Sequence, residues 1–289
     1  MNHPPVLIDS SAALVELCGE LQGCAWLAVD TEFERVNTYY PELCLVQVAG
    51  EGVVAVIDVL GISDLEPLYE LLHAPSVTKV FHAARQDLEL FFHIRGEVPA
   101  PVFDTQIAAA LLDYDQQIGY SNLVREVLGV ELPKSQARTD WKRRPLRQKQ
   151  LEYAADDVIY LSRLYEVLRE KLEGSEKWRQ LEEQCRSLNR PELYEPDPGE
   201  MWRKIKIREV KGFGEASMAV FRQLAAWREL TARRENRPRK WIIKDHALVA
   251  IARELPADRA TLSRLNGIGD KVMDRYGEEL LKIVSNDKL

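Results

Sequence analysis

Three strand-like segments follow one another closely near the start of the chain, and this succession restricts the possible folds more than any other feature. They cover residues 26–33, 44–48 and 53–57, and a glycine-containing turn separates the last two. Short connections of this kind suit a meander of antiparallel strands. We therefore expect a sheet to form the centre of this part of the chain.

Helical patterns follow the meander and alternate with a short strand at residues 79–81. A first helix is expected after Ser10 and Ser11, and another is expected from a cap at Ser63 and Asp64 to about His73. Four more helices are expected at about residues 85–94, 104–113, 121–128 and 146–172. The alternation predicts an α/β or α+β domain.

A proline-rich segment then divides the chain. Residues 190–199 contain three prolines and a glycine, which break regular structure. Beyond them the apolar spacing is typical of short packed helices. We therefore expect a first domain at residues 1–189, a linker or strap at 190–210, and a small all-helical domain at 211–289.

The two parts of the chain also differ in charge. The whole chain has 39 Lys and Arg against 46 Asp and Glu; residues 201–289 hold 20 against 12, which leaves 19 against 34 for residues 1–200. This asymmetry suggests a basic module that binds a polyanion beside an acidic module that holds cations. Solvated charged surfaces on both domains are the alternative.

Two carboxylates in the first predicted strand could form a paired metal site. Asp30 and Glu32 are two positions apart, and alternation along a strand points both side chains to one face. The same Asp-x-Glu pattern occurs at Asp64 and at Asp87, but in predicted helices, where side chains two positions apart diverge. Chance occurrence of the triplet is the alternative reading.

A second constellation lies in the last long helix of the first domain. Tyr153 and Asp157 are four positions apart, so that the tyrosine hydroxyl and the carboxylate share one helical face, while Asp156 points about 100° away. Taken alone, such a pair is usually an ordinary boundary pair. It becomes informative only together with the strand carboxylates.

Read with the segment 81–87, these residues resemble the three motifs of the DEDD superfamily of 3′-5′ exonucleases, in the branch that has tyrosine in its third motif. Six further segments resemble the ribonuclease D family, at residues 30–33, 38–41, 103–107, 134–135, 138–141 and 144–146. The resemblance implies a ribonuclease H-like mixed sheet flanked by helices. It also implies a 3′-5′ exoribonuclease that releases 5′-mononucleotides.

The resemblance implies a role for each of five residues at the catalytic centre. Asp30 would bridge two divalent cations, Mg²⁺ or Mn²⁺, whose preference is for hard carboxylate oxygens. Glu32 and Asp157 would complete the site that activates water, and Asp87 would support the second ion. Tyr153 would orient the water, because a phenol with a pKa near 10 is a poor general base.

Three neighbouring residues have simpler readings. Asp104 is expected to cap the helix that follows it rather than to touch metal. His82 is expected to be a hydrogen-bonded residue at the edge of the core. Phe33 could stack on the terminal base of a substrate or could be a core aromatic residue.

Basic residues supply two candidate RNA-binding surfaces. The loop before the Tyr153 helix contains Lys134, Arg138, Arg143 and Arg144, which could hold backbone phosphates. The C-terminal part resembles the HRDC domain, and its candidate phosphate contacts are Arg233, Arg234, Lys240 and Lys244. The chain has room for one such domain, whereas well-known bacterial family members carry two, so substrate range and processivity are open.

Other expectations concern partners and location. No apolar run approaches the roughly 20 residues that span a bilayer, and residues 1–10 do not resemble a signal peptide, so a cytoplasmic protein is expected. The expected partner is RNA, such as transfer RNA precursors, with no membrane, no nucleotide cofactor and a monomeric state. The alternatives are a related exonuclease that prefers DNA and a catalytically silent nucleic-acid-binding protein.

Overall fold

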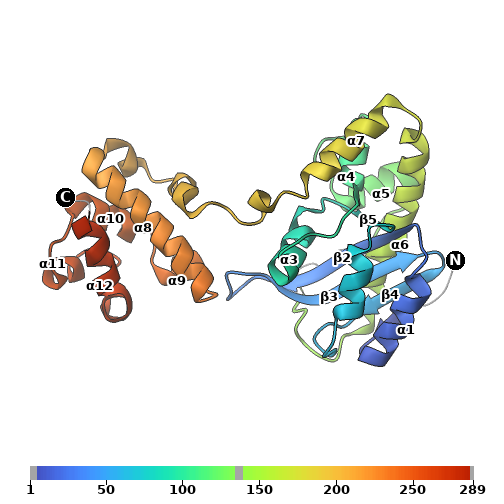
Figure 1. The fold of residues 1–289 in the computed structure, drawn as a ribbon, viewed down its shortest axis with the longest axis horizontal. Coiled ribbons are helices and arrows are strands. Elements are labelled where there is room, and N and C mark those ends of the chain that lie inside the picture. The colour runs from blue at the N-terminus through green and yellow to red at the C-terminus, as the bar shows by residue number, and fades with distance from the viewer. Residues whose placement is uncertain (1–4, 134–138, 287–289) are drawn as a thin grey trace. The chain divides into compact units, whose positions relative to one another are not determined.

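The structure, a computed structural model, describes residues 5–133 and 139–286. The chain forms two compact units (Figure 1). The first comprises Met1–Glu34 and Pro41–Tyr194, and the second comprises Arg35–Tyr40 and Glu195–Leu289. A short loop between two strands of the first unit thus packs as part of the second unit.

A six-stranded mixed sheet forms the centre of the first unit in the part of the chain that the structure describes. In chain order, its strands are β1 (Val6–Ile8), β2 (Trp26–Glu34), β3 (Glu42–Gly50), β4 (Val53–Ile57), β5 (Thr78–Phe81) and β6 (Val102–Asp104). The spatial order is β1-β4-β3-β2-β5-β6. Strands β2, β3 and β4 are antiparallel neighbours, which confirms the predicted meander, and the other pairings are parallel.

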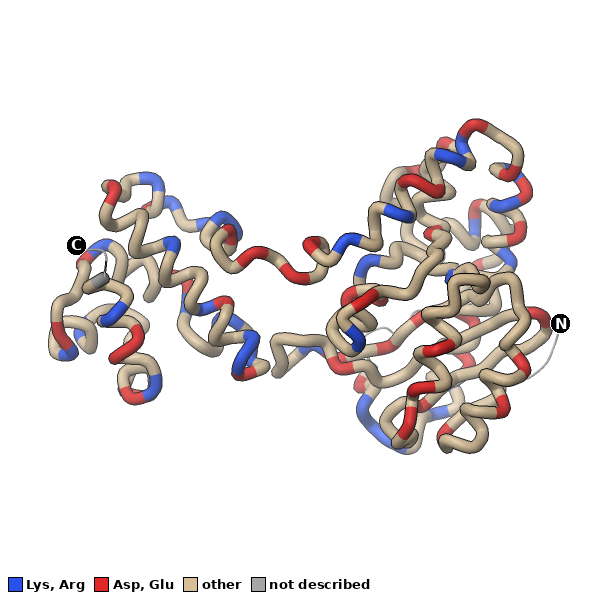
Figure 2. The backbone as a smooth tube through the Cα atoms, viewed as in Figure 1, with Lys and Arg blue, Asp and Glu red and all other residues tan. Residues whose placement is uncertain are grey.

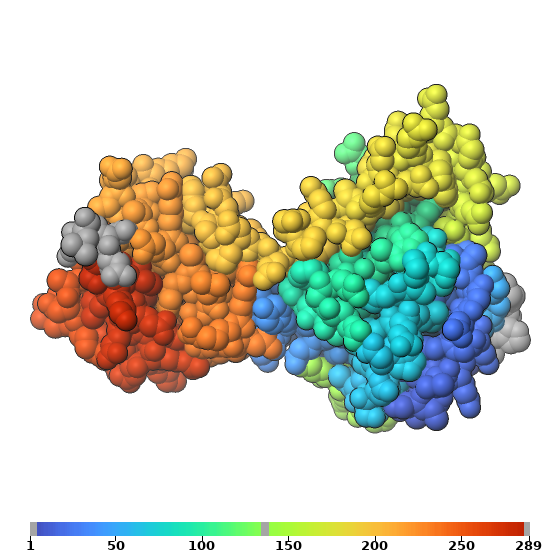
Figure 3. All heavy atoms as spheres, viewed as in Figure 1, coloured from blue at the N-terminus to red at the C-terminus, as the bar shows by residue number. Residues whose placement is uncertain are grey.

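Helices cover both faces of the sheet, and alternate residues of β2 contact different groups of helices. Leu27 and Val29 pack in one core with the first three helices of the unit, whereas Ala28 packs in a second core with the next four. Figures 1 and 3 show the first layer in front of the sheet. The helices of this unit are α1 (Ser11–Leu21), α2 (Glu66–His73), α3 (Arg85–Arg95), α4 (Thr105–Leu111), α5 (Tyr120–Leu128), α6 (Gln148–Leu172) and α7 (Glu176–Ser187).

Helix α2 begins later than the sequence predicts. Its first residue is Glu66, and Asp64 does not cap it: the Asp64 carboxylate accepts from the Glu66 amide in a turn that precedes the helix. The predicted cap at Ser63 and Asp64 is therefore one to two residues too early, because the N-cap position is Leu65, whereas the predicted end at His73 is confirmed. Strands β1 and β6 and helix α7 were not predicted. All four cysteines are buried free thiols.

The second unit has a helical core around α8, which buries Phe221 and Leu224 against Leu248 of α10 and Leu280 of α12. Two 3-10 helices, Pro198–Lys204 and Arg208–Gly212, precede it, and a third, Pro191–Leu193, ends the first unit. The α-helices are α8 (Glu215–Arg234), α9 (Arg239–Ile242), α10 (Asp245–Glu254), α11 (Arg259–Ser263) and α12 (Asp270–Asn286). Among the described residues, no helix is long and apolar enough to cross a bilayer.

Candidate active site and metal centre

Strand β2 and helix α6 bring three carboxylates together. Asp30 and Glu32 share the face of β2 that carries Ala28, which is the face covered by α6. Asp157 projects from α6, and one oxygen of each of the three carboxylates lies within 4.8 Å of the others. This arrangement provides a cluster of hard oxygen ligands of the kind that Mg²⁺ or Mn²⁺ binds.

The fourth expected ligand approaches from the other face of the sheet. Asp87 lies in the first turn of α3, is 8% exposed, and accepts a hydrogen bond from the Thr31 hydroxyl, Oγ1 to Oδ1, at 2.5 Å. Thr31 alternates with Asp30 and Glu32, so it faces the α1–α3 layer. Sequence reasoning missed Thr31, although a polar residue between two paired acids was a usable signal.

Burial raises the pKa values of all four carboxyl groups, and repulsion from other members of the set adds to the rise at Asp30, Glu32 and Asp87. Burial is the largest cause in each case, and the charge of Asp157 adds to it at Asp30, while the charge of Asp30 adds to it at Asp87. The pKa of Glu32 rises to about 9 and that of Asp157 to about 7. Such a cluster fits divalent cations, because their positive charge would compensate the repulsion between ionised carboxylates.

Two tyrosines hold Asp157. Burial raises the pKa of the Asp157 carboxyl, and a hydrogen bond from Tyr153 partly counteracts that rise. The Tyr120 hydroxyl, at the start of α5, donates to the main-chain carbonyl of Asp157 at 2.5 Å. Tyr153 is predicted from its helical spacing to Asp157, whereas Tyr120 lies 37 residues away in the sequence and gives no local signal.

The turn between β5 and α3 is fixed by Asp104. Its carboxylate accepts from the amides of Ala83 and Ala84 at 3.0 and 2.9 Å, and also caps α4 through the Gln106 amide. The predicted cap is therefore confirmed, and the same side chain supports the left-handed residue Ala83, which has a φ of 54°. His82 is hydrogen-bonded to Thr105 and to the Ile118 carbonyl, as expected for a residue at the core edge.

A cavity of about 380 Å³ opens beside the carboxylate cluster. Its lining includes Tyr120, Asn122, Tyr153, Asp156 and Asp157. Aromatic rings, an amide and acidic groups in one concave site could accommodate a polar ring-containing ligand of nucleotide size.

The basic residues near α6 fall into different classes. Arg144 is engaged by Asp58 through two hydrogen bonds of 2.5 and 2.6 Å, whereas Arg143 is exposed. Lys134 and Arg138 lie outside the described residues. Phe33, next to the strand carboxylates, is half-buried.

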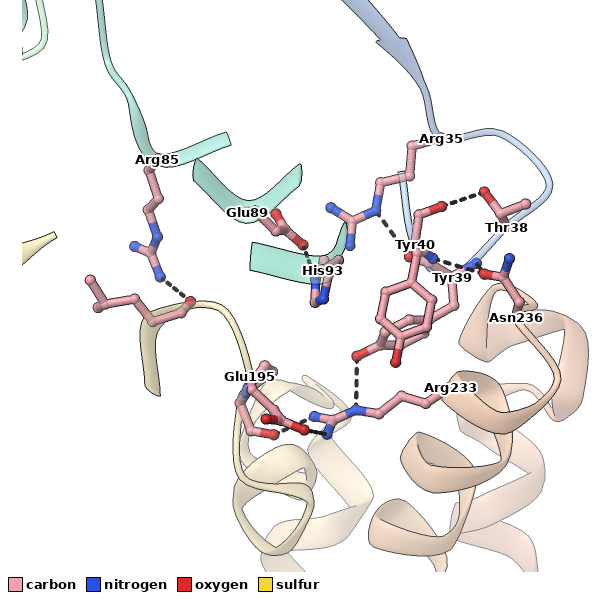
Figure 4. Close-up of polar contacts among 12 residues, drawn as sticks. Arg35, Thr38, Tyr39, Tyr40, Arg85, Glu89, His93, Glu195, Arg233 and Asn236 are labelled. Atoms are coloured by element: carbon pink, nitrogen blue, oxygen red, sulfur yellow. Dashed lines mark hydrogen bonds and ion pairs between the residues drawn. The ribbon is translucent and has the colours of Figure 1, made fainter. Parts of the chain in front are cut away.

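The second unit shows the same division. Arg233 is 13% exposed and bonds to Glu229, to the Tyr39 hydroxyl and to Glu195, and Figure 4 shows its guanidinium between Tyr39 and Glu195. Its charge is therefore already compensated inside the unit. Arg234 and Lys240 are 60% and 77% exposed, and Lys244 is exposed. Figure 2 shows that acidic residues interrupt the basic ones along α8, which therefore carries no unbroken basic strip.

Comparisons with known proteins extend over both units. The profile of a 3′-5′ exonuclease family matches residues 5–173, and the HRDC domain profile matches residues 217–284. Ribonuclease D of Granulibacter bethesdensis is 42% identical over 283 residues, which cover 97% of this chain and 71% of that protein.

Two solved structures are also similar. The crystal structure of Escherichia coli RNase D, described as an exoribonuclease involved in structured RNA processing, aligns with a TM-score of 0.88 and 35% identity over 100% of this chain and 76% of that one. Brucella melitensis NrnC with bound Mg²⁺ aligns with a TM-score of 0.55 and 34% identity, covering 67% of this chain and 92% of its own.

Proposed function

Because the chain belongs to the ribonuclease D family and is a 3′-5′ exoribonuclease, we propose that it hydrolyses RNA 3′ ends with two divalent cations held by Asp30, Glu32, Asp87 and Asp157. The observation that carries this proposal is the cluster of three carboxylates contributed by β2 and α6. The Mg²⁺ bound to Brucella melitensis NrnC also supports it. Either Mg²⁺ or Mn²⁺ suits the oxygen donors.

The protein contributes positioning to this reaction. Two bound cations would supply a nucleophilic water at neutral pH and would stabilise charge on the leaving oxygen. Asp30 and Glu32, fixed on a strand at the centre of the sheet, hold their oxygens in place without a large loss of side-chain freedom on binding. Tyr153 is placed to orient a water beside Asp157.

The substrate is proposed to be structured RNA with extra 3′ nucleotides, such as transfer RNA precursors. This step rests on the description of Escherichia coli RNase D as a processor of structured RNA. Exposed cations in the second unit, Arg234, Lys240 and Lys244, would contact phosphates away from the 3′ end, and Arg143 would do so near the site. Phe33 is proposed to contact the terminal base. Arg144 and Arg233 serve structure instead.

The test is digestion of 5′-labelled RNA and of DNA of the same sequence with Mg²⁺, with Mn²⁺ and with chelator. We expect a ladder that shortens from the 3′ end of RNA only when metal is present, and its loss in Asp30→Asn. Asp64→Asn is the matched control, because it changes another Asp-x-Glu pair that is exposed and outside the cluster. Full turnover by Asp30→Asn would refute the metal assignment, and faster cutting of DNA would refute the RNA preference.

A further inference from the structure

Strand β3 places a fully buried amide side chain directly beside Asp30. Gln47 is the antiparallel partner of Asp30 in the register of β2 and β3, and its side chain is 0% exposed. Residues opposite each other on one face of such a pair have Cβ atoms about 4.5 to 5.5 Å apart. A glutamine at this position can therefore reach the neighbouring carboxylate.

Both side chains lie on the same face of the sheet. Leu45 and Ala49, two positions before and after Gln47, belong to cores that contain residues of α6, whereas Val46 and Val48 belong to the core on the opposite face. Alternation therefore directs Gln47 toward α6, as it directs Asp30 and Glu32. The amide is enclosed between the sheet and the helix that carries Asp157.

The amide makes no hydrogen bond in this arrangement. Among the described residues, neither Nε2 nor Oε1 of Gln47 has a partner. Each unsatisfied buried polar atom costs about 1 to 3 kcal/mol, and an apolar side chain of similar shape would avoid that cost. Gln150, a second buried glutamine with an unpaired atom, uses its Oε1 to cap α6 through the Arg147 amide, so its burial has a structural reason.

We propose that Gln47 is a positioning residue for the metal centre, whose amide donates to the Asp30 carboxylate when a divalent cation is bound and fixes the oxygen that ligates it. This inference rests on the proposed metal site. A carboxylate that ligates a cation keeps lone pairs that a second-shell donor can occupy, and such donors orient the ligand and sharpen metal affinity. Gln47 supplies the donor, and its enclosure keeps water from competing for it.

The proposal predicts effects of opposite sign for Gln47→Met, which keeps the length of the side chain and removes its polar atoms. In chelator, the full-length variant should unfold at the same temperature as wild type or at a higher one, because an unsatisfied amide is gone. Its dissociation constant for Mn²⁺ without RNA, measured by calorimetry, should rise about tenfold. The value of kcat should fall while KM for RNA stays nearly constant.

Thr231→Val is the matched control. Thr231 is also 0% exposed with an unpaired side-chain oxygen, but it lies in α8 of the second unit. Its replacement should raise the unfolding temperature in chelator without changing Mn²⁺ affinity. The proposal is overturned if Gln47→Met binds Mn²⁺ as tightly as wild type. It is also overturned if Gln47→Met loses as much free energy of unfolding in chelator as it loses free energy of Mn²⁺ binding.

The Asp30→Asn variant distinguishes failure of the metal assignment from failure of the role proposed for Gln47. If it abolishes Mn²⁺ binding while Gln47→Met leaves it intact, only the role of Gln47 is wrong. If Asp30→Asn itself binds Mn²⁺ normally, the metal assignment and the role of Gln47 are both wrong. Gln47→Leu repeats the measurements with a second apolar side chain if the methionine variant does not fold.

Discussion

The hydroxyl of Tyr39 donates a hydrogen bond to the carboxylate of Glu229, 190 residues away in the sequence. Arg233 and Arg239 also bond to Glu229, whose side chain is 0% exposed. Although burial opposes ionisation, hydrogen bonds from Arg239 and Tyr39 hold the pKa of Glu229 below its usual range. The network makes the loop at residues 35–40 part of the second unit, in agreement with its packing.

Removing members of this network should destabilise the second unit to different extents. Glu229→Ala should lower the free energy of unfolding by about 3 kcal/mol, because Arg233 and Arg239, 13% and 33% exposed, lose a carboxylate that is fully buried between them. Tyr39→Phe should cost only about 1 kcal/mol, because both arginines still satisfy Glu229. Guanidinium unfolding of the two variants measures the difference.

Tyr276→Phe is the control for this pair. Its hydroxyl donates to Glu235, which lies in the same unit but outside the loop at residues 35–40. Asn236 Oδ1 accepts hydrogen bonds from the amides of Tyr39 and Tyr40 (Figure 4), so hydrogen exchange at these amides should accelerate in Asn236→Ala. It should also accelerate in Tyr39→Phe, which loses the bond between the loop and Glu229. Acceleration in Tyr276→Phe as well would mean that the loop responds to general destabilisation.

The sequence predicted the centre of the fold and the carboxylate pattern because both depend on short-range periodicity. Alternation placed Asp30 and Glu32 on one face, and helical spacing placed Tyr153 beside Asp157. Strand β1 was missed because it has three residues, too few for a period to appear, and its pairing with β4 spans about 50 residues of chain.

Tertiary partners explain the remaining differences. A run of basic residues does not reveal which of them meets a carboxylate, so the contacts of Arg144 with Asp58 and of Arg233 with Glu229 could not be predicted from the sequence. Gln47 similarly read as an ordinary strand residue, because its burial and its cross-strand neighbour depend on register. Register is a property of the assembled sheet.

Lys79 predicts a pH dependence of stability. Its ammonium group is 0% exposed and donates to the carbonyls of Ala74, Val77 and Ala100, and burial lowers its pKa to about 8. The unfolded chain, with a lysine pKa near 10.4, binds more protons above pH 8, so stability should rise with pH in this range.

The expected gain is about 2 kcal/mol between pH 7 and pH 9.5, taken as the difference between wild type and Lys79→Met. Using the difference cancels the titration of other groups common to both proteins. Urea unfolding at several pH values measures it. The prediction is contradicted if the free energy of unfolding of wild type minus that of Lys79→Met stays constant or falls as the pH rises, because the pKa of Lys79 would then not be lowered.

Metal removal should destabilise wild type and leave Asp30→Asn as the more stable of the two proteins. Saturating Mn²⁺ at about 100 times its dissociation constant should stabilise wild type by about 2.7 kcal/mol, and chelator should remove this gain. In chelator at pH 8, Asp30→Asn should be the more stable protein, because it lacks one of several repelling buried carboxylates. Thermal unfolding with Mn²⁺ and with chelator measures both differences in stability. A wild-type unfolding temperature that does not change with chelator would contradict the proposed metal site.

Tyr153→Phe should lower kcat by about 10 to 100-fold while Mn²⁺ still binds, because the phenol orients the water and is not a ligand. Tyr120→Phe should instead affect Asp157 through its main chain, and Mn²⁺ affinity should weaken about fivefold. Tyr114→Phe, in the loop between α4 and α5, is the control and should change neither quantity. Loss of Mn²⁺ binding in Tyr153→Phe would make Tyr153 part of the metal site.

Salt dependence distinguishes the exposed cations from Arg144, although Arg234 and Lys240 also lie 3.9 and 4.0 Å from the carboxylates of Glu279 and Asp245. Each phosphate contact contributes about 0.7 to the slope of log affinity against log salt on single-stranded nucleic acid. Neutralising Arg143, Arg234, Lys240 and Lys244 to glutamine should therefore reduce the slope for RNA by up to about 3 and leave the unfolding temperature nearly unchanged. Arg144→Gln should lower the unfolding temperature and leave the slope nearly unchanged, because the Arg144 guanidinium already donates two hydrogen bonds to Asp58. Fluorescence anisotropy measures the affinity for RNA without hydrolysis when every variant also carries Asp30→Asn. If Arg144→Gln reduces the slope without lowering the unfolding temperature, Arg144 contacts RNA after all.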